Sequence, residues 1–455
     1  MCPKCGTSGP TPGSTKGGAA SPAPALASER AERAAGPLRE ADATRTYYGL
    51  TAVSAFAFAL CFTLNLVFQY RVIGLDPFQM VLVGTVLEAT TFLFEVPTGV
   101  VADLVSRRLS VIIGFLLTGL AFVVEGGIAT FAAALLGNVV WGIGYTFVSG
   151  ALQAWITDEV GPEHVAPVFT RGVQVDLVAS IVGILGAGAL GLVALRVPVI
   201  VSGVVFVALA VALLLVMPER SFEPTPRGDR ETFAHLRAQF LAGLRVARRR
   251  PVVRALLVVS LLAGLASEVF DRLWRVRLIE SFSLPDVAGG DEALAFTAIA
   301  LVGTVVSLGA SLASSRWLPR RIVEQHPAIP VGAGSALEVL AVAGVAVLGS
   351  LWLVLGCVWL RGASKAFTGP IEDAWLNRHL DPATRATVLS MNGQADAIGQ
   401  VAGGPPLGAL ASRTSIPVAL LVASVVQAPA VAALLRVRNV PPRPSDEPLE
   451  AVRQE

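Results

Sequence analysis

The sequence predicts an all-α membrane protein in which twelve transmembrane helices form two pseudo-symmetric bundles of six. Hydrophobic residues make up 54% of the 455 residues and charged residues only 15%, against roughly 25% charged residues in ordinary soluble proteins. Apolar stretches near or above the ~20 residues that cross a bilayer as a helix recur almost from end to end. In addition, residues 374–410 repeat the pattern of residues 154–190.

The apolar stretches fall into two groups. The longest connection, residues 218–251, separates a predicted bundle at 47–217 from a second bundle at 252–437. We expect the helices at residues 47–70, 79–102, 108–127, 129–155, 168–195, 198–217, 252–277, 293–314, 328–349, 351–374, 386–411 and 415–436.

The two ends of the chain differ from the bundles. Residues 1–46 are rich in Gly, Pro, Ser, Ala and Thr without periodicity, which predicts a disordered tail, and residues 438–455 form a second tail. The first tail has no apolar core and so is not a secretory signal peptide. It opens with "CPKC", but a structural zinc needs four ligands, and Cys61 and Cys357 fall inside predicted membrane helices. We therefore expect no metal site and no cofactor.

Arginines are distributed unequally between the two sides of the predicted membrane. One side holds Arg107, Arg108, Arg171, Arg220, Arg254, Arg316, Arg320, Arg321, Arg378 and Arg385. The other side has, near helix ends, only Arg71, Arg196, Arg275, Arg277 and Arg413. Because positive residues favour the cytoplasm, both termini should be cytoplasmic in a multi-pass protein of the plasma or inner membrane. Because the charge asymmetry lies across the membrane, the formal net charge of +2 is uninformative about partners. We expect no nucleic-acid partner.

The connection at 218–251 contains a predicted amphipathic helix. Phe233, Leu236, Phe240 and Leu244 recur at helical spacing, with arginines between and after them. Such a helix fits the surface of the inner leaflet. A solvated linker helix is the alternative.

The repeat relates the two predicted bundles without any gap. It pairs Trp155 with Trp375 and Asp176 with Asp396, and "GAL" at 188–190 recurs at 408–410. Matching positions in two six-helix halves predict duplicated halves in parallel orientation, which is typical of secondary transporters that rock about a central site.

Residues 95–108 read "EVPTGVVADLVSRR". Gly99 and Asp103 are four residues apart and share a helix face, and two arginines follow at the membrane surface. This pattern resembles the loop signature of the major facilitator superfamily, which has a glycine, three residues, an aspartate and a turn that ends in two basic residues. Leu104 and Ser106 depart from the usual basic residue and glycine. The resemblance extends over residues 47–437, and "GALQAWITDEV" and "RATVLSMNGQADAIGQ" look like the drug-exporting branches, including the tetracycline and macrolide exporters.

The resemblance implies a gate on the cytoplasmic side. In the family this loop bears on closure between the halves, so Gly99, Asp103, Arg107 and Arg108 are the candidate gating residues. Gly99 would let a neighbouring helix come close. The alternative for Arg107 and Arg108 is that they only set the topology.

Three charged residues are expected near the middle of the bilayer. Glu88, Glu338 and Arg361 lie about ten residues from the starts of their helices, and Lys365 lies one turn beyond Arg361. A charge at that depth must be paired, neutral or exposed to a water-filled cavity. The resemblance places the tenth helix at the cavity, so Arg361 and Lys365 are candidate substrate contacts, and Glu88 and Glu338 are candidate proton carriers. Structural ion pairs are the alternative.

The seventh predicted helix carries a charged cluster, "SEVFDRLWRVR". Glu268 and Arg272 are four residues apart, as are Asp271 and Arg275, so each pair can form along the helix. The cluster lies toward the outer end, where it is either interfacial or an outer gate. Glu268 and Asp271 complete the set of candidate proton-coupling residues, among which Glu338 leads because Arg361 on the next helix could be its partner.

Amphipathic side chains line the expected cavity. Trp141, Tyr145 and Gln153 form a stripe with Ser149 on the fourth helix, and Asn65 and Gln69 lie on the first. Such residues suit amphiphilic molecules that bind by stacking and a few hydrogen bonds. Anchoring of Trp and Tyr at the interface is the alternative.

These observations predict a secondary active transporter that exports amphiphilic drugs or small metabolites by proton-coupled alternating access. An importer of a small polar or anionic solute, or a nontransporting sensor on the same fold, is the alternative. No GxSxG, HExxH or P-loop motif is present, so we do not expect an enzyme. The expected partners are a small-molecule substrate, protons and the lipid bilayer, and we expect a monomer.

Overall fold

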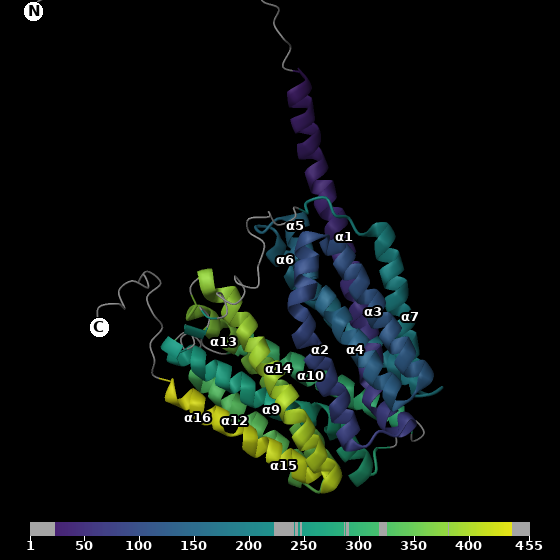
Figure 1. The fold of residues 1–455 in the computed structure, drawn as a ribbon, viewed down its shortest axis with the longest axis vertical. Helices are drawn as coiled ribbons and strands as arrows, with labels where there is room; N and C mark the ends of the chain where they lie inside the picture. The colour runs from purple at the N-terminus through teal and green to yellow at the C-terminus, as the bar shows by residue number, and fades with distance from the viewer. Residues whose placement is uncertain are drawn as a thin grey trace, which may run out of the picture.

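The computed structural model describes residues 23–222, 241, 244, 245, 248–285, 287, 291–317, 325–380 and 382–438, and within them it contains helices and no strand. Figure 1 shows the first half, purple to teal, on the right and the second half, green to yellow, on the lower left. The helices are α1 (Ala23–Phe68), η1 (Gln69–Ile73), α2 (Pro77–Leu104), α3 (Arg107–Ile128), α4 (Phe131–Val148), α5 (Ala151–Val160), α6 (Val165–Gly191), α7 (Arg196–Val216), α9 (Pro251–Ser281), α10 (Glu292–Trp317), α12 (Ala328–Val347), α13 (Leu351–Arg378), α14 (Pro382–Arg413), α15 (Ile416–Gln427) and α16 (Pro429–Arg436).

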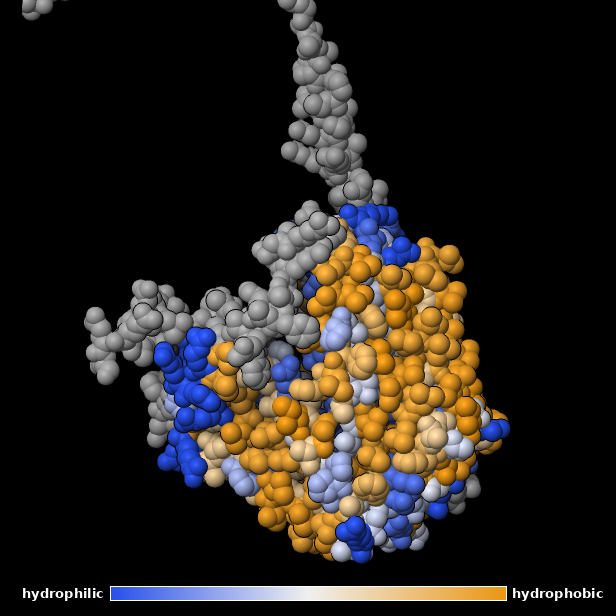
Figure 2. All heavy atoms as spheres, viewed as in Figure 1, coloured by the Kyte–Doolittle hydropathy of each residue, from blue (hydrophilic) through white to orange (hydrophobic). Residues whose placement is uncertain are grey.

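Most of the helices suit a bilayer in both length and composition. In the described part of the chain, ten segments are long and apolar enough to cross a membrane. The other two predicted spans are α13 and α14, which are 28 and 32 residues long but more polar. Length therefore supports all twelve predicted spans, and apolar composition supports ten. Figure 2 shows the corresponding surface, an apolar band in orange with hydrophilic patches in blue at both ends.

Helix α1 begins earlier than predicted. It starts at Ala23, where the sequence analysis expected a disordered tail up to residue 46. Residues 25–46 are rich in Ala, Glu and Arg, which are strong helix formers, and they continue directly into the membrane span. The "CPKC" pair, the tail at 439–455 and most of the predicted amphipathic helix at 233–244 lie outside the described residues.

Two predicted spans are interrupted. The span at 129–155 is divided into α4 and α5 at Ser149 and Gly150, and Gly150 has a φ of 71°, which glycine adopts readily. The span at 415–436 is divided into α15 and α16 before Pro429, which cannot donate a backbone hydrogen bond.

Equivalent helices approach each other at equivalent glycines in the two halves. Helix α6 packs on α1, and α14 packs on α9. A Cβ added to Gly183 on α6 would overlap the carbonyl oxygen of Phe56, and one added to Gly403 on α14 would overlap that of Leu265. Gly183 and Gly403 are partners in the sequence repeat, so the structure confirms two pseudo-symmetric halves.

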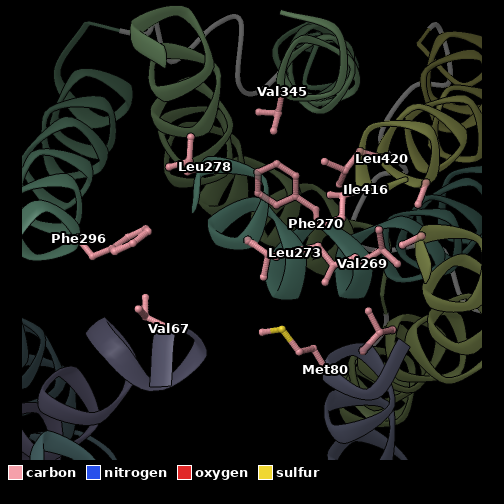
Figure 3. Close-up of a cluster of buried hydrophobic side chains, with 14 of the residues drawn as sticks. Val67, Met80, Val269, Phe270, Leu273, Leu278, Phe296, Val345, Ile416 and Leu420 are labelled. Carbon is pink, nitrogen blue, oxygen red and sulfur yellow. The ribbon is translucent and has the colours of Figure 1, made fainter. Parts of the chain in front are cut away.

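The hydrophobic clusters show where the halves meet. We call the end that contains residues 105–106 and 161–164 the proximal end, and the end that contains residues 74–76 and 348–350 the distal end. Two clusters each belong to one half, whereas the third contains residues of both halves. In this shared cluster, Val67 and Met80 of the first half pack toward Leu273 and Phe296 of the second (Figure 3). The halves are therefore joined at the distal end.

Candidate functional site

Polar contacts reinforce the distal junction. Arg71 forms an ion pair with Glu292 at 2.5 Å, and the Tyr70 hydroxyl donates to Glu280 Oε1 at 3.0 Å. Each contact joins η1 of the first half to an element of the second half. The distal end is therefore closed by hydrogen bonds as well as by apolar packing.

The proximal end is open around the predicted gating residues. A Cβ added to Gly99 would have no atom within 4 Å, so the predicted close helix contact is absent from this conformation. The Asp103 side chain is 55% exposed and has Arg107 as its ion-pair partner at 3.6 Å. The role of these residues in closing the proximal end stays a prediction.

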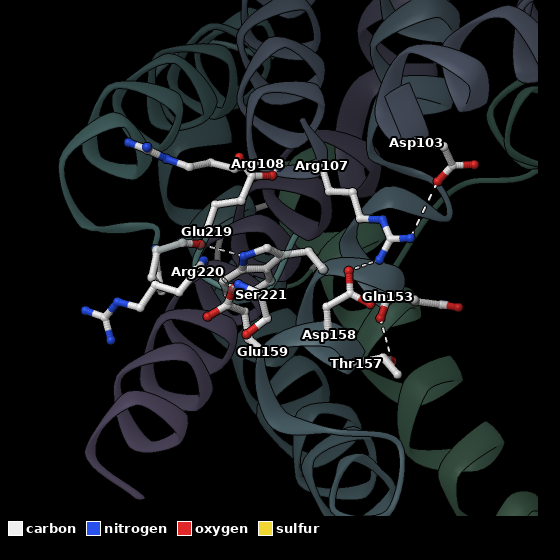
Figure 4. Close-up of polar contacts among 12 residues, drawn as sticks. Asp103, Arg107, Arg108, Gln153, Thr157, Asp158, Glu159, Glu219, Arg220 and Ser221 are labelled. Carbon is white, nitrogen blue, oxygen red and sulfur yellow. Dashed lines mark hydrogen bonds and ion pairs between the residues drawn. The ribbon is translucent and has the colours of Figure 1, made fainter. Parts of the chain in front are cut away.

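The two arginines that were predicted to act in gating, Arg107 and Arg108, make their contacts within the first half (Figure 4). Arg107 forms an ion pair with Asp158 of α5. The backbone N–H of Arg108 donates to Glu219 Oε1 at 2.9 Å, and the Ser106 hydroxyl donates to Glu219 Oε2 at 2.6 Å. These contacts tie the start of α3 to α5 and to the segment after α7, so they stabilise the proximal end of the first half.

A buried ion pair lies between the halves. Glu268 and Arg272 of α9 are 2.9 Å apart, and Glu268 is 4% exposed. A Cβ on Gly84 of α2 would overlap both side chains, and one on Gly404 of α14 would lie 3.4 Å from Glu268 Cγ. The predicted pairing is confirmed, and its position where α2, α9 and α14 meet fits the outer-gate interpretation.

The second predicted pair on α9 does not form. Asp271 accepts from Arg361 of α13 at 2.9 Å, whereas the Arg275 guanidinium lies 4.4 Å from the centre of the Trp274 ring. In this conformation Arg361 pairs with Asp271, and it remains a charged neighbour of Glu338. Its role as a switching partner of Glu338 stays a prediction. Asp271 lies on α9 and Glu338 on α12, and both of these helices pack against α13.

A buried carboxylate that the sequence analysis missed lies in the first half. Glu125 of α3 is 2% exposed, and its Oε1 accepts from Gln69 Nε2 at 2.7 Å and from Asn65 Nδ2 at 3.3 Å. Asn65 and Gln69 were predicted to line a cavity. They are instead buried and donate hydrogen bonds to Glu125. Gln69 also begins the π-helical segment η1, a geometry that is frequent at functional sites.

A cavity of about 400 Å³ lies between α2 and α4 of the first half and α14 of the second. Of the predicted site residues, it brings together Glu88, Trp141 and Tyr145, with Ser149 beside them. Its full lining is Leu87, Glu88, Thr91, Phe92, Glu95, Trp141, Tyr145, Ser149, Gly393, Gln394 and Ala397. We call this space the central cavity.

Three other predicted substrate contacts lie outside the central cavity. Arg361 is held by Asp271. Lys365 is exposed, with Glu338 and Asp396 as acidic neighbours. Gln153 is exposed on α5, where its backbone carbonyl accepts from Thr157 (Figure 4).

Comparisons with known proteins agree with this geometry. The chain is 20% identical over 352 residues to YxaM of Bacillus subtilis (strain 168), an uncharacterized MFS-type transporter, over 77% of this chain and 85% of that one. Among solved structures, a mutant of the nucleoside transporter NupG has a TM-score of 0.73 at 13% identity, over 86% of this chain and 99% of that one. An auto-inhibited POT family peptide transporter has a TM-score of 0.70 at 13% identity, over 89% and 98%.

The two structural similarities show a shared fold. The family itself is shown by the sequence, because the Major Facilitator Superfamily pattern matches residues 48–341, which is more than half of the chain. The chain therefore belongs to the Major Facilitator Superfamily and is a multi-pass membrane transporter of that type.

Proposed function

We propose that this transporter exports amphiphilic small molecules in exchange for protons by alternating access. The observation that carries the proposal is a set of buried carboxyl groups. Glu125, Glu268 and Glu338 are 2%, 4% and 7% exposed. Of these three, only Glu268 has a basic group within ion-pair distance in the described part of the chain. A buried charge without a partner is costly, so such a group holds a proton or finds a partner in another conformation.

The distribution of arginines indicates which end of the protein faces the cytoplasm. Arg107, Arg108 and Arg254 lie at the proximal end, and positive residues favour the cytoplasm. We infer that the proximal end and both termini are cytoplasmic and that the described conformation faces inward. The central cavity then opens to the cytoplasm, as an exporter needs when it loads its substrate.

Arg272 supports a coupling route between the halves. It is hydrogen-bonded to Glu268, and Glu88 and Glu125 are further acidic neighbours. Opening of the distal end would draw α2 away from the pair and admit water. A proton can then enter at Glu268 while Arg272 turns toward another carboxylate, and the reverse movement releases the proton inward.

Inverted membrane vesicles test this function, because export appears there as uptake. We expect an acidic interior to drive accumulation of amphiphilic dyes, and a protonophore to abolish it. Glu125→Gln, Glu268→Gln and Glu338→Gln are compared with Glu163→Gln, which changes an exposed carboxylate on a turn. At least one buried variant should lose the gradient-driven component, whereas Glu163→Gln should keep it. Accumulation that persists after the proton gradient is collapsed would contradict proton coupling.

A further inference from the structure

We propose that the central cavity is a binding site for an amphiphilic cation, in which Glu88 and Glu95 bind the charge and aromatic rings bind the apolar body. This inference rests on the proposed function, because it names the substrate class of the same transporter.

The charge of the cavity wall is the first argument. Glu88 and Glu95 both line the cavity, and they are seven residues apart on α2, which places them on one helix face ~10 Å apart along the axis. No Lys or Arg is among the described residues that line it. The nearby Arg272 is bound to Glu268. Carboxylates that face a cleft with low-dielectric walls attract cations and repel anions.

The aromatic wall is the second argument. Phe92, Trp141 and Tyr145 face the same cavity as the carboxylates. The Trp141 ring is held 5.0 Å from the Phe62 ring and 5.5 Å from the Phe122 ring, so this wall is fixed in place. Tyr145 is 50% exposed and its ring is available to a ligand. Faces of Trp and Tyr rings attract cations, and quaternary ammonium ligands bind between such rings.

The position of the cavity is the third argument. Glu88 and Trp141 belong to the first half, whereas Gly393 and Gln394 belong to α14 of the second half. A Cβ on Gly393 would have no atom within 4 Å, so the wall from the second half leaves room for a ligand. A volume of about 400 Å³ is within the range of drug-sized sites. A cation bound here touches both halves and therefore senses their relative movement.

Equilibrium binding to the purified protein tests the proposal without any gradient. The probe is tetraphenylphosphonium, and the control ligand is tetraphenylborate, which has nearly the same shape and the opposite charge. We expect tetraphenylphosphonium to bind at least roughly tenfold more tightly than tetraphenylborate. Glu88→Gln and Glu95→Gln should each weaken tetraphenylphosphonium binding by roughly tenfold, and Glu163→Gln should leave it unchanged.

Two further results keep the test decisive. Glu95→Asp retains the charge and should retain most of the affinity, so a loss in Glu95→Gln is then due to charge and not to misfolding. Equal affinities for the two probes, or wild-type affinity in the Glu88→Gln, Glu95→Gln double variant, would overturn the cation site while leaving proton-driven export of other amphiphiles intact. Tight cation binding that depends on both carboxylates supports the site even if vesicles show no proton-driven uptake.

Discussion

The replacement Glu268→Gln should open the distal end of the protein. Glu268 and Arg272 form a buried pair that Gly84 of the first half covers. Removing the carboxylate charge leaves the Arg272 guanidinium buried without its partner. The cost falls on the distal-closed state, because this is the state in which α2 excludes water from the pair.

The size of the effect follows from the burial of the pair. Removal of one partner from a buried ion pair costs about 3–5 kcal/mol. Glu88 and Glu125 are further acidic neighbours of Arg272 and offset part of this cost, so we take about 3 kcal/mol. At 1.4 kcal/mol for each factor of ten, the ratio of distal-open to distal-closed molecules should rise by roughly 100-fold.

Cysteine labelling measures this shift. Thr297 of α10 is buried against Gly188 of α6. A Cβ added to Gly188 would lie 2.7 Å from the Thr297 hydroxyl oxygen. In a protein without other cysteines, Thr297→Cys should react slowly with a membrane-impermeant maleimide. Glu268→Gln should accelerate that labelling strongly.

The double variant Glu268→Gln, Arg272→Gln is the matched control. It removes both charges, so no unpaired charge remains buried, and labelling at Thr297→Cys should return toward the slow rate. If Glu268→Gln labels as slowly as its parent, or if the double variant labels as fast as Glu268→Gln, the pair does not hold the distal end closed.

Three other predictions follow from the described contacts. Asp103→Asn should slow turnover and leave substrate affinity within a few fold, because Asp103 lies at the proximal end and away from the central cavity; complete loss of binding in a folded variant would contradict this. Gly403→Val should destabilise the fold by about 1–3 kcal/mol through overlap with α9. Gly99→Ala should leave the melting temperature unchanged, because no atom lies within 4 Å of the added Cβ. Equal melting temperatures for the two variants would refute the packing argument. A cysteine at Val287 should react with an impermeant reagent in intact cells and one at Glu163 only after permeabilisation, and the opposite pattern would reverse the proposed topology.

Local pairings were predictable from the sequence, and pairings between helices were not. Glu268 and Arg272 are one helical turn apart, so their spacing alone brings them together. Asp271 and Arg361 are ninety positions apart on two helices. A single sequence does not show which sides of two helices pack together. Arg275 lies one helical turn from Asp271 and was the predicted partner. Asp271 pairs instead with Arg361 of another helix.

Glu125 illustrates a second limit. The predicted helix at 108–127 placed it near the end of its span, where a charged residue needs no explanation. In the structure α3 continues to Ile128, and Asn65 and Gln69 of neighbouring elements enclose the carboxylate. The apolar stretches identified the helices, but the burial of a residue near a helix end depends on the neighbouring elements that cover it. The repeat was more informative, because its glycine pair marked helix contacts that the structure contains.

The shared hydrophobic cluster at the distal end makes the conformational equilibrium depend on temperature. When the halves separate there, Val67, Met80 and Phe296 lose apolar neighbours and meet water. Exposure of apolar surface raises the heat capacity, and the free energy gained by burying that surface falls on cooling. Separation at the distal end therefore contributes a positive heat-capacity change to opening, and the resistance of this cluster to opening weakens on cooling.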